Sequence, residues 1–365
     1  MKILHLSSEQ TWRGGEQQIA YLLEETEKRG IQPIVACKQG SAFEIYVRSK
    51  GWQYFALPFK NSMDLRTAWN IKRICKEHKI DIIHLHSSKA HSIAVWSVVL
   101  GNSSKLVLSR RVDFPLKDNL FSRWKYNHTS IQKIICVSDK IKHIVEEGVQ
   151  DKDKCITIHS GIALGKFALQ GKLNYFHSHY KIPPASPIIG NTSALADHKD
   201  YFTFINTAEI LINQNNDLRF LIIGDGPLRS EIVSYVASKR LENHIVFTGF
   251  ITNLAQTLPE LDVFLMTSKT EGLGTSILDA FASKVPVVAT NAGGIPELVK
   301  HEETGLIAPV KDHEKLAENV NRILNEPELK ERLIINAYDF VQGFSKEKTA
   351  ERTLAVYREI LADKT

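Results

Sequence analysis

The stretch "KTEGLGTSILDAFASKVPVVAT", residues 269–290, places two carboxylates around a turn that contains glycines. It follows the apolar run "DVFLMTS" and passes into a helical pattern, so it predicts a strand, a turn and a helix. Such a turn presents free backbone N–H groups and the positive end of a helix dipole, which suits a phosphate. Gly272 and Gly274 would let a ligand approach the backbone closely.

The two carboxylates, Glu271 and Asp279, border that turn on opposite sides. If the helix begins near Thr275, Asp279 lies one turn into it, and its side chain leans toward the N-terminus of the helix. A carboxylate is repelled by phosphate and is better suited to the hydroxyl groups of a sugar or a ribose. The competing interpretation is an ordinary helix start, where an acidic side chain is favoured without any ligand.

The rest of the chain alternates strand-like and helical patterns. Six apolar runs of strand length precede a Gly- and Pro-containing stretch at 165–186, and six more follow it. Apolar strands separated by helices indicate parallel sheets covered on both faces, with ligand crevices at the carboxyl ends of the strands. We expect two Rossmann-like, doubly wound domains at 1–170 and 171–345, and a last helix at 346–365 that packs back toward the first domain.

Composition restricts the class of protein. The chain has 365 residues, of which 43% are hydrophobic and 24% are charged, as in soluble globular proteins. No apolar run approaches the roughly 20 residues that span a bilayer, and the first residues lack a signal-peptide pattern. The four cysteines are far apart, which fits a reducing compartment. We therefore expect a cytoplasmic protein.

Charge is unevenly distributed along the chain. Residues 1–160 hold 25 Lys and Arg against 16 Asp and Glu, a net charge of +9, whereas the remainder holds 21 against 25, a net charge of −4. The basic half predicts either an anionic surface or ligand as its partner, or only a solvated surface.

Three more candidate sites follow predicted strands. Gly224 and Gly226 lie in the turn "GDGP", Lys199 follows the first strand of the second series, and Gly14 and Gly15 open the first helix. A lysine at such a place can meet a phosphate, and glycines allow close approach. A tight turn, a surface lysine and a flexible turn are the respective alternatives.

Basic side chains gather at strand ends in the first domain. His84 and His86 follow one strand, and Arg110 and Arg111 follow the next. His84, His86 and His91 are three potential zinc ligands, but no carboxylate or fourth ligand accompanies them, so no metal site is expected.

Together these motifs resemble family 4 of the retaining glycosyltransferases, which have the GT-B fold. The family pattern is a glutamate, seven residues and a second glutamate, and here it stands as Glu271, "GLGTSIL" and Asp279. The segments "RGGEQQ", "ITIHSGIALGKF", "IIGDGPLR", "NAGGIPELV" and "TGLIAPV" resemble other family segments in the same order. The resemblance covers nearly the whole chain and implies two Rossmann-like domains that face each other across a cleft.

The resemblance also implies roles for individual residues. Glu271 would lie against the donor sugar, Asp279 would bind the ribose hydroxyls, and Lys199 would neutralise the diphosphate. The implied catalytic set is completed by Arg111. The implied donor-binding residues are Gly14, Gly15, Glu16, Gly224, Gly226, Gly272, Leu273, Gly274, Thr275 and Asp279. The acceptor is assigned to the first domain, with His84, His86 and Arg110.

Three positions depart from the family pattern. The second acid is Asp279, the family's arginine falls on Ala194, and the family's histidine falls at or beside Arg111. Arg111 could take the place of that histidine against the donor sugar, or it could recognise an anionic acceptor or donor. All three changes together could also mark an inactive relative.

The sequence thus predicts a retaining, metal-independent glycosyltransferase without a cofactor. It would move a sugar from a nucleotide diphosphate sugar to a glycan or glycolipid acceptor in cell-envelope polysaccharide or lipopolysaccharide biosynthesis. It would work in the cytoplasm, where it could make peripheral contact with anionic lipid at the inner face of the cytoplasmic membrane, and it would bind no nucleic acid. The alternatives are a GT-B nucleotide-sugar epimerase and a non-catalytic nucleotide-sugar-binding subunit.

Overall fold

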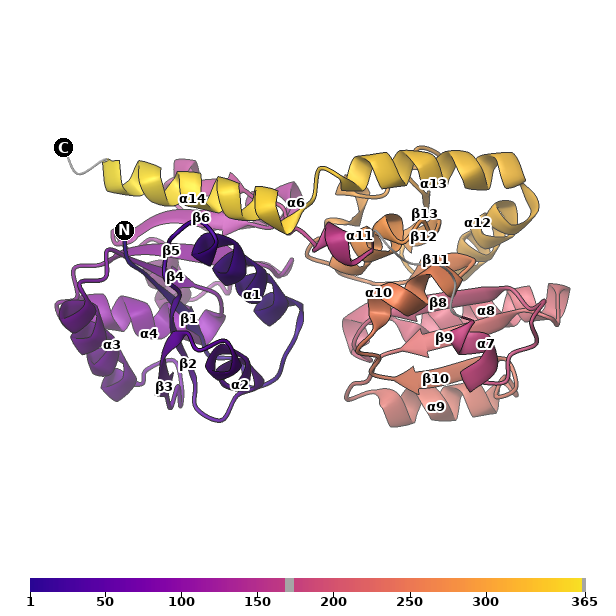
Figure 1. Cartoon of the computed structure of the whole chain (residues 1–365), viewed down its shortest axis with the longest axis horizontal. Coiled ribbons are helices and arrows are strands. Elements are labelled where there is room, and N and C mark those ends of the chain that lie inside the picture. The colour runs from indigo at the N-terminus through magenta and orange to yellow at the C-terminus, as the bar shows by residue number, and fades with distance from the viewer. Residues whose placement is uncertain (168–173, 363–365) are drawn as a thin grey trace. The chain divides into compact units, whose positions relative to one another are not determined.

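A computed structural model describes residues 1–167 and 174–362 of the chain. The chain forms two compact units (Figure 1). Unit 1 consists of Met1–Gly161 and Lys346–Thr365, and unit 2 consists of Ile162–Ser345. The last helix therefore belongs to the same unit as the N-terminal half of the chain.

Unit 1 is built on a parallel sheet with helices on both faces. Its described strands are β1 (Ile3–Ser7), β2 (Ile34–Lys38), β3 (Gln53–Leu57), β4 (Ile82–Leu85), β5 (Lys105–Arg110), β6 (Ile131–Cys136) and β7 (Cys155–Thr157). They lie in the order β3-β2-β1-β4-β5-β6-β7. Its described helices are α1 (Gly14–Glu27), α2 (Ala42–Ser49), α3 (Leu65–His78), α4 (Ser88–Val99), α5 (Leu120–Tyr126), α6 (Asp139–Glu146) and α14 (Lys346–Ala362), with a 3₁₀ turn, η1, at Lys152–Lys154.

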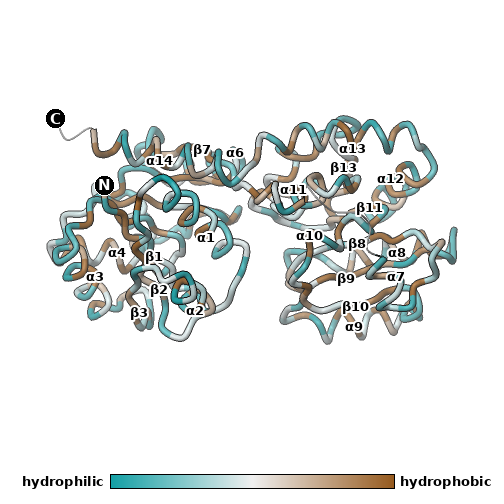
Figure 2. The backbone as a smooth tube through the Cα atoms, in the orientation of Figure 1, coloured by the Kyte–Doolittle hydropathy of each residue, from teal (hydrophilic) through white to brown (hydrophobic). Residues whose placement is uncertain are grey.

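The last helix, α14, covers one face of the unit 1 sheet. Ile3, Ile82 and Val107 lie on three neighbouring strands and pack in one core with Leu354 and Tyr357 of α14. Figure 2 shows the corresponding apolar segments of the strands and the helix. Burial of this apolar stripe explains why α14 belongs to unit 1.

Unit 2 repeats the architecture with its own core. Its described strands are β8 (Ile188–Thr192), β9 (Arg219–Ile223), β10 (Ile245–Gly249), β11 (Val263–Met266), β12 (Val287–Thr290) and β13 (Leu306–Ala308), in the order β10-β9-β8-β11-β12-β13. Its described helices are α7 (Tyr175–His179), α8 (Tyr201–Gln214), α9 (Arg229–Ser238), α10 (Leu254–Thr257), α11 (Thr275–Ala282), α12 (His313–Asn325) and α13 (Pro327–Val341). Its short 3₁₀ turns are η2 (Leu164–Lys166), η3 (Asp197–Lys199), η4 (Leu258–Glu260) and η5 (Ile295–Glu297).

Both sheets are parallel throughout their described pairings, so the expectation of two Rossmann-like domains is confirmed. In each sheet the chain first builds outward in one direction and then returns to build in the other. The direction changes between β1 and β4 in unit 1 and between β8 and β11 in unit 2. Ligands of doubly wound folds bind at such switch points, beyond the carboxyl ends of the strands.

Two local elements differ from expectation. β3 was not predicted, because this edge strand buries little: only Leu57 of its five residues is fully buried. The helix α7 lies in the stretch expected to be a linker, where the backbone N–H groups of Tyr175 and Phe176 donate to the carboxylate of Glu260 at 2.7 and 2.8 Å. None of the described helices combines the length and apolar character needed to cross a membrane.

Candidate functional site

The switch point of unit 2 brings together Lys199 and Glu271. Lys199 ends the 3₁₀ turn that follows β8, and Glu271 follows β11. The two side chains form an ion pair and are only 13% and 15% exposed. The Ser268 hydroxyl donates a further, long hydrogen bond of 3.4 Å to Glu271 Oε2. Two predicted site residues, 72 positions apart, are therefore in direct contact at the predicted edge of the sheet.

The glycine turn leads from Glu271 into α11 as expected. Gly274 is the N-cap of α11 and has φ 91°, a left-handed conformation that favours glycine. No side chain caps this helix start among the described residues, so its first N–H groups are not taken by a side chain. The Gly294 N–H donates to the Glu271 carbonyl at 2.9 Å, which fixes the turn to the next loop.

Asp279 lies one turn into α11, at the position expected for a ribose ligand. Burial raises its pKa to about 7, and Lys166 acts in the opposite direction. The carboxyl group is thus far less acidic than an exposed aspartate. Hydroxyl donors from a ligand would favour its ionised form.

Gly224 and Gly226 are explained by contact with the backbone of the neighbouring loop. A Cβ at Gly226 would lie 2.5 Å from the Leu195 carbonyl oxygen, and one at Gly224 would collide with the Ser193 carbonyl oxygen. The Leu195 N–H donates to the Asp225 carbonyl at 3.1 Å, which holds the two loops together. Their donor-binding role therefore stays a prediction, since packing alone requires these glycines.

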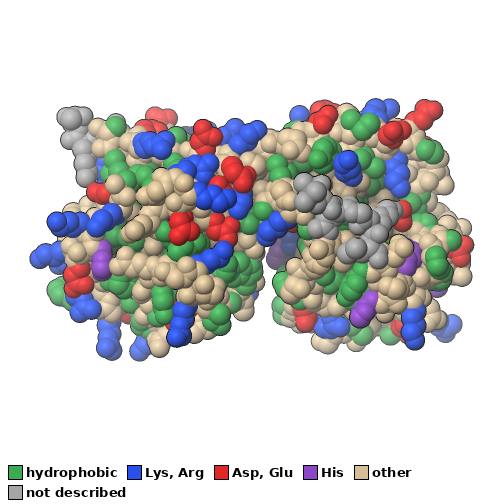
Figure 3. Space-filling model, in the orientation of Figure 1, with side chains coloured by type: hydrophobic (Ala, Val, Ile, Leu, Met, Phe, Trp, Pro, Cys, Tyr) green, Lys and Arg blue, Asp and Glu red, His purple; other side chains and the backbone are tan. Residues whose placement is uncertain are grey.

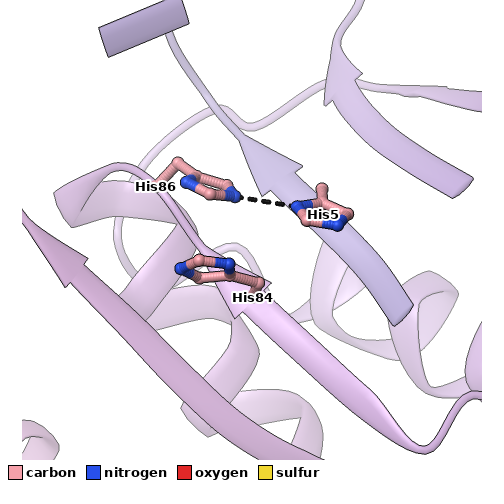
Figure 4. A group of neighbouring side chains, drawn as sticks. All are labelled: His5, His84 and His86. Atoms are coloured by element: carbon pink, nitrogen blue, oxygen red, sulfur yellow. Dashed lines mark hydrogen bonds between the residues drawn. The ribbon is translucent and has the colours of Figure 1, made fainter. Parts of the chain in front are cut away.

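The switch point of unit 1 holds a group of buried histidines (Figure 4). His5 of β1 and His84 of β4 are register partners, and His86 follows two residues later on the same face. The His5 Nδ1 and His86 Nε2 atoms are 3.0 Å apart in a hydrogen bond. Both nitrogens of His84 are also engaged, one by the Tyr357 hydroxyl and the other, at 2.8 Å, by the Ser109 hydroxyl.

The three imidazoles are neutral at ordinary pH. Burial lowers the pKa of all three, that of His5 to about 3. Their nitrogens lie within 4.8 Å of one another, a spacing that could hold a metal ion. The cluster contains His5 in place of His91, which lies on α4 with its Nε2 3.0 Å from the Lys125 carbonyl oxygen. A metal ion on this cluster would displace a hydrogen-bond partner of His84 and would lie near the positive charge of Arg111.

The two arginines that follow β5 differ in their surroundings. Arg110 is buried, and its two Nη groups donate to the Tyr126 hydroxyl at 3.1 Å and to the Phe114 carbonyl at 2.5 Å. Arg111 is half-buried, its Nε is buried without a hydrogen-bond partner, and no hydrogen bond or ion pair joins it to the described residues. Burial lowers the pKa of its guanidinium to about 10, although Glu16 counteracts this.

The start of α1 lies beside Arg111. Glu16 is buried, where it accepts from the Ser7 hydroxyl and from the Arg13 N–H, both at 3.2 Å, and burial raises its pKa. A Cβ at Gly14 would meet no atom within 4 Å, and one at Gly15 would lie 3.9 Å from Arg111 Cδ. The packing of unit 1 therefore does not require these two glycines, unlike Gly224 and Gly226 of unit 2.

Sequence reasoning missed His5, Tyr357 and Lys166 as neighbours of the candidate sites. His5 could have been found from the pattern, because "ILHLS" and "IIHLHS" share alternation and lie on adjacent parallel strands. Tyr357 gave no such signal, since its contact with His84 joins residues 273 positions apart. Lys166 lies just before the junction between the two series of strands, where no motif drew attention to it.

Comparisons with known proteins identify the family of the chain. The family model "Glycosyltransferase Family 4" matches residues 12–166, and the model "Glycosyl transferases group 1" matches residues 176–340. The chain is 24% identical to N-acetyl-alpha-D-glucosaminyl L-malate synthase of Bacillus anthracis, over 82% of this chain and 80% of that protein. It is 23% identical to the Escherichia coli UDP-Gal:alpha-D-GlcNAc-diphosphoundecaprenol alpha-1,3-galactosyltransferase, over 82% and 81% of the two chains.

Solved structures match the fold over nearly the whole chain. HepE of Anabaena, crystallised in complex with UDP and glucose, superposes with a TM-score of 0.85 at 18% identity. The match covers 98% of this chain and 100% of that chain.

Proposed function

This chain belongs to family 4 of the glycosyltransferases, with the GT-B fold, and we propose that it is a retaining, metal-independent enzyme. It moves a sugar from a nucleotide diphosphate sugar to a hydroxyl group of a glycan or glycolipid acceptor. The observation that carries the proposal is the Lys199–Glu271 ion pair beside the uncapped start of α11, at the switch point of unit 2.

The proposed chemistry is electrostatic. When the glycosidic bond breaks, negative charge develops on the leaving diphosphate and positive charge on the sugar. The N–H groups of Leu273, Gly274 and Thr275 and the Lys199 ammonium would stabilise the first, and the Glu271 carboxylate would face the second. In the free enzyme Lys199 is neutralised by Glu271, so an incoming diphosphate would share this cation with the carboxylate.

The nucleotide is proposed to be UDP, held by unit 2, where Asp279 accepts from the ribose hydroxyls. Two observations support this: the position of Asp279 one turn into α11, and the UDP present in the structurally similar HepE. The acceptor is assigned to unit 1. The E. coli relative is named for a sugar on diphosphoundecaprenol, which supports a role in cell-envelope glycan synthesis.

We further propose that unit 1 contacts the inner face of the cytoplasmic membrane without crossing it. The support is its charge, since residues 1–160 carry a net +9. Figure 3 shows Lys and Arg side chains spread over the visible face, interspersed with acidic ones, so the contact would be weak and salt-dependent. Sedimentation with liposomes tests it: equal binding to neutral and anionic vesicles would refute the contact.

The function is tested by incubating the full chain with UDP-sugars, with and without lipid-linked or glycan acceptors, and following UDP release and product by mass spectrometry. Acceptor-dependent UDP release with the anomeric configuration kept is the expected result. A new isomer of the nucleotide sugar without an acceptor would instead indicate an epimerase. Two results would together indicate a non-catalytic subunit: UDP binds without turnover, and Glu271→Gln leaves the function of the protein in cells intact.

A further inference from the structure

Five side-chain nitrogens of unit 1 are buried without a hydrogen-bond partner among the described residues: His86 Nδ1, His91 Nδ1, Trp96 Nε1, Arg110 Nε and Arg111 Nε. Two of them, Arg111 Nε and His86 Nδ1, lie at the carboxyl ends of β5 and β4 on side chains that face the switch-point histidines or belong to them. Buried polar groups are nearly always hydrogen-bonded, and an unpaired guanidinium N–H is especially costly. Two such groups at one switch point indicate that a ligand supplies the missing acceptor.

The residues that the structure describes do not supply that acceptor. The carboxylate of Glu16 acts on the charge of Arg111 but forms no hydrogen bond with it; its two oxygens accept from the Ser7 hydroxyl and the Arg13 N–H. The remaining imidazole, that of His84, uses both nitrogens for Tyr357 and Ser109. Arg110 also has an unpaired Nε, but both of its Nη groups donate hydrogen bonds, whereas the Arg111 guanidinium makes none with the described residues.

The ligand that fits is an anion and not a cation. Arg111 lies close enough to His84 and His86 to lower the pKa of each, so a metal ion on these imidazoles would meet a neighbouring positive charge. A metal would also require His84 to give up one of its hydrogen bonds. When His5 Nδ1 donates to His86 Nε2, the free Nδ1 of His86 carries a proton and becomes a donor.

We propose that the unit 1 crevice binds a carboxylate group of a substrate, through the fork of Arg111 and the Nδ1–H of His86. A planar carboxylate suits the two parallel N–H bonds of a guanidinium. A carboxylate carries one negative charge, which the single cation Arg111 can balance. A phosphate monoester carries up to two and would require a second cation. The proposal rests on the proposed function and narrows it: either the transferred sugar or the acceptor is an acid. Gly15, beside Arg111, leaves room for the group.

The first experiment compares matched neutral and acidic ligands with the unmodified chain at fixed ionic strength. Calorimetry with UDP-glucose and UDP-glucuronic acid tests the donor as the source of the carboxylate. Calorimetry with 4-nitrophenyl β-glucoside and 4-nitrophenyl β-glucuronide, with UDP present, tests the acceptor. The acidic member of one pair is expected to bind about tenfold more tightly, or better, as for a charge-assisted hydrogen bond.

Variants identify the residue responsible. Arg111→Gln should abolish the preference for the acid while binding of UDP alone is kept, and Arg111→Lys should keep part of the preference. Arg123→Gln is the matched control, because it removes the same charge from an exposed side chain of the same unit, and it should leave the preference intact. The wild-type comparison needs no variant, so a misfolded Arg111→Gln would not prevent the test.

Failure of this proposal is separable from failure of the proposed function. Binding of UDP with no preference for either acid, or a preference that survives Arg111→Gln, overturns the carboxylate site and leaves the glycosyltransferase assignment standing. Absence of UDP binding refutes the proposed donor. The glycoside pair is then measured without UDP, and equal binding of the two overturns the carboxylate site as well.

Discussion

The crevices of the two units have the same topology but opposite states of charge pairing. In unit 2 the cation Lys199 and the carboxylate Glu271 neutralise each other. In unit 1 the cation Arg111 makes no hydrogen bond or ion pair with the described residues, although the Glu16 carboxylate acts on its charge, and its Nε is buried. The same fold thus holds one crevice whose charges are paired and one whose charge is left open.

The glycines of the two crevices differ in a parallel way. Gly224 and Gly226 of unit 2 are required by contact with the backbone of the adjoining loop. In unit 1 a Cβ at Gly14 would meet no atom within 4 Å, and one at Gly15 would make only an ordinary contact with Arg111 Cδ. A glycine that its own fold requires says little about ligands. A glycine without that requirement is better evidence of a ligand that approaches the backbone.

The largest expected effect comes from removing the paired cation of unit 2. Lys199→Ala should lower kcat about 10²–10³-fold, because a preorganised positive charge facing the leaving diphosphate is lost. UDP release with a competent donor and acceptor measures it. KM for the donor should change less than kcat, since the interaction strengthens as the bond breaks.

Lys269→Ala is the matched control for Lys199→Ala. Lys269 lies in the loop that follows β11 and pairs with the exposed Asp197 at 2.9 Å. Exposed ion pairs contribute little, so turnover should stay within about twofold of the wild type. Equal losses in the two variants would mean that the general charge of the crevice matters, and not the placement of Lys199.

The contrast between the glycines predicts the next largest effect. Gly226→Ala should destabilise unit 2 by about 1–3 kcal/mol, because the new Cβ lies 2.5 Å from the Leu195 carbonyl oxygen. Gly14→Ala should change the free energy of unfolding by less than about 0.5 kcal/mol. Thermal unfolding of both variants measures this, and a melting temperature lowered as much by Gly14→Ala would break the comparison.

Much of the fold could be predicted because the information is local. Twelve of the thirteen described strands are apolar runs that alternate with amphipathic helices, and this pattern alone specifies parallel sheets. β3 could not be found this way, because an edge strand with exposed residues lacks the signal. The position of α7 depends on the Glu260 carboxylate, a contact between residues about 85 positions apart.

The site of unit 2 was predictable for the same reason, since Glu271, Gly274 and Asp279 lie in one continuous motif. The site of unit 1 is assembled from separate strands and from α14. Whether Arg110 or Arg111 is free depends on which of them reaches Tyr126 and Phe114, which no spacing in the sequence reveals. Composition and motif therefore find charged residues at the crevice, but packing decides which of them is left unpaired.

A smaller effect concerns the buried acid of unit 2. The folded-state pKa of Asp279 is about 7, above its usual value, so the folded protein holds a proton that the unfolded chain loses at lower pH. The free energy of unfolding therefore falls as pH rises from about 4 to 7, and it does not fall further above pH 7 on account of this group. Asp279→Asn cannot ionise, so it should be more stable than the wild type at pH 8, by about 1 kcal/mol after allowance for solvent screening.

Calorimetric melting temperatures at pH 4.5 and pH 8 measure this difference. The advantage of Asp279→Asn should be larger at pH 8, while its affinity for UDP should be lower because the amide replaces an ionised acceptor. Asp279→Asn removes the charge and keeps the size of the side chain, whereas Asp279→Ser also shortens it. Comparing the UDP affinities of the two variants separates loss of the charge from loss of the side chain. Parallel changes of melting temperature with pH in wild type and Asp279→Asn would contradict the buried, weakly acidic carboxyl group.

The smallest effect is expected from metal removal. In the proposed mechanism, Lys199 and backbone N–H groups of unit 2 stabilise the diphosphate in place of a divalent cation. In unit 1 the histidine cluster lies beside Arg111, which disfavours a second cation. Treatment with EDTA followed by desalting should therefore change UDP release by less than about twofold. Loss of activity that Zn²⁺ or Mg²⁺ restores, but does not restore in His5→Gln, would contradict this prediction. The histidine cluster would then bind a cation in spite of Arg111.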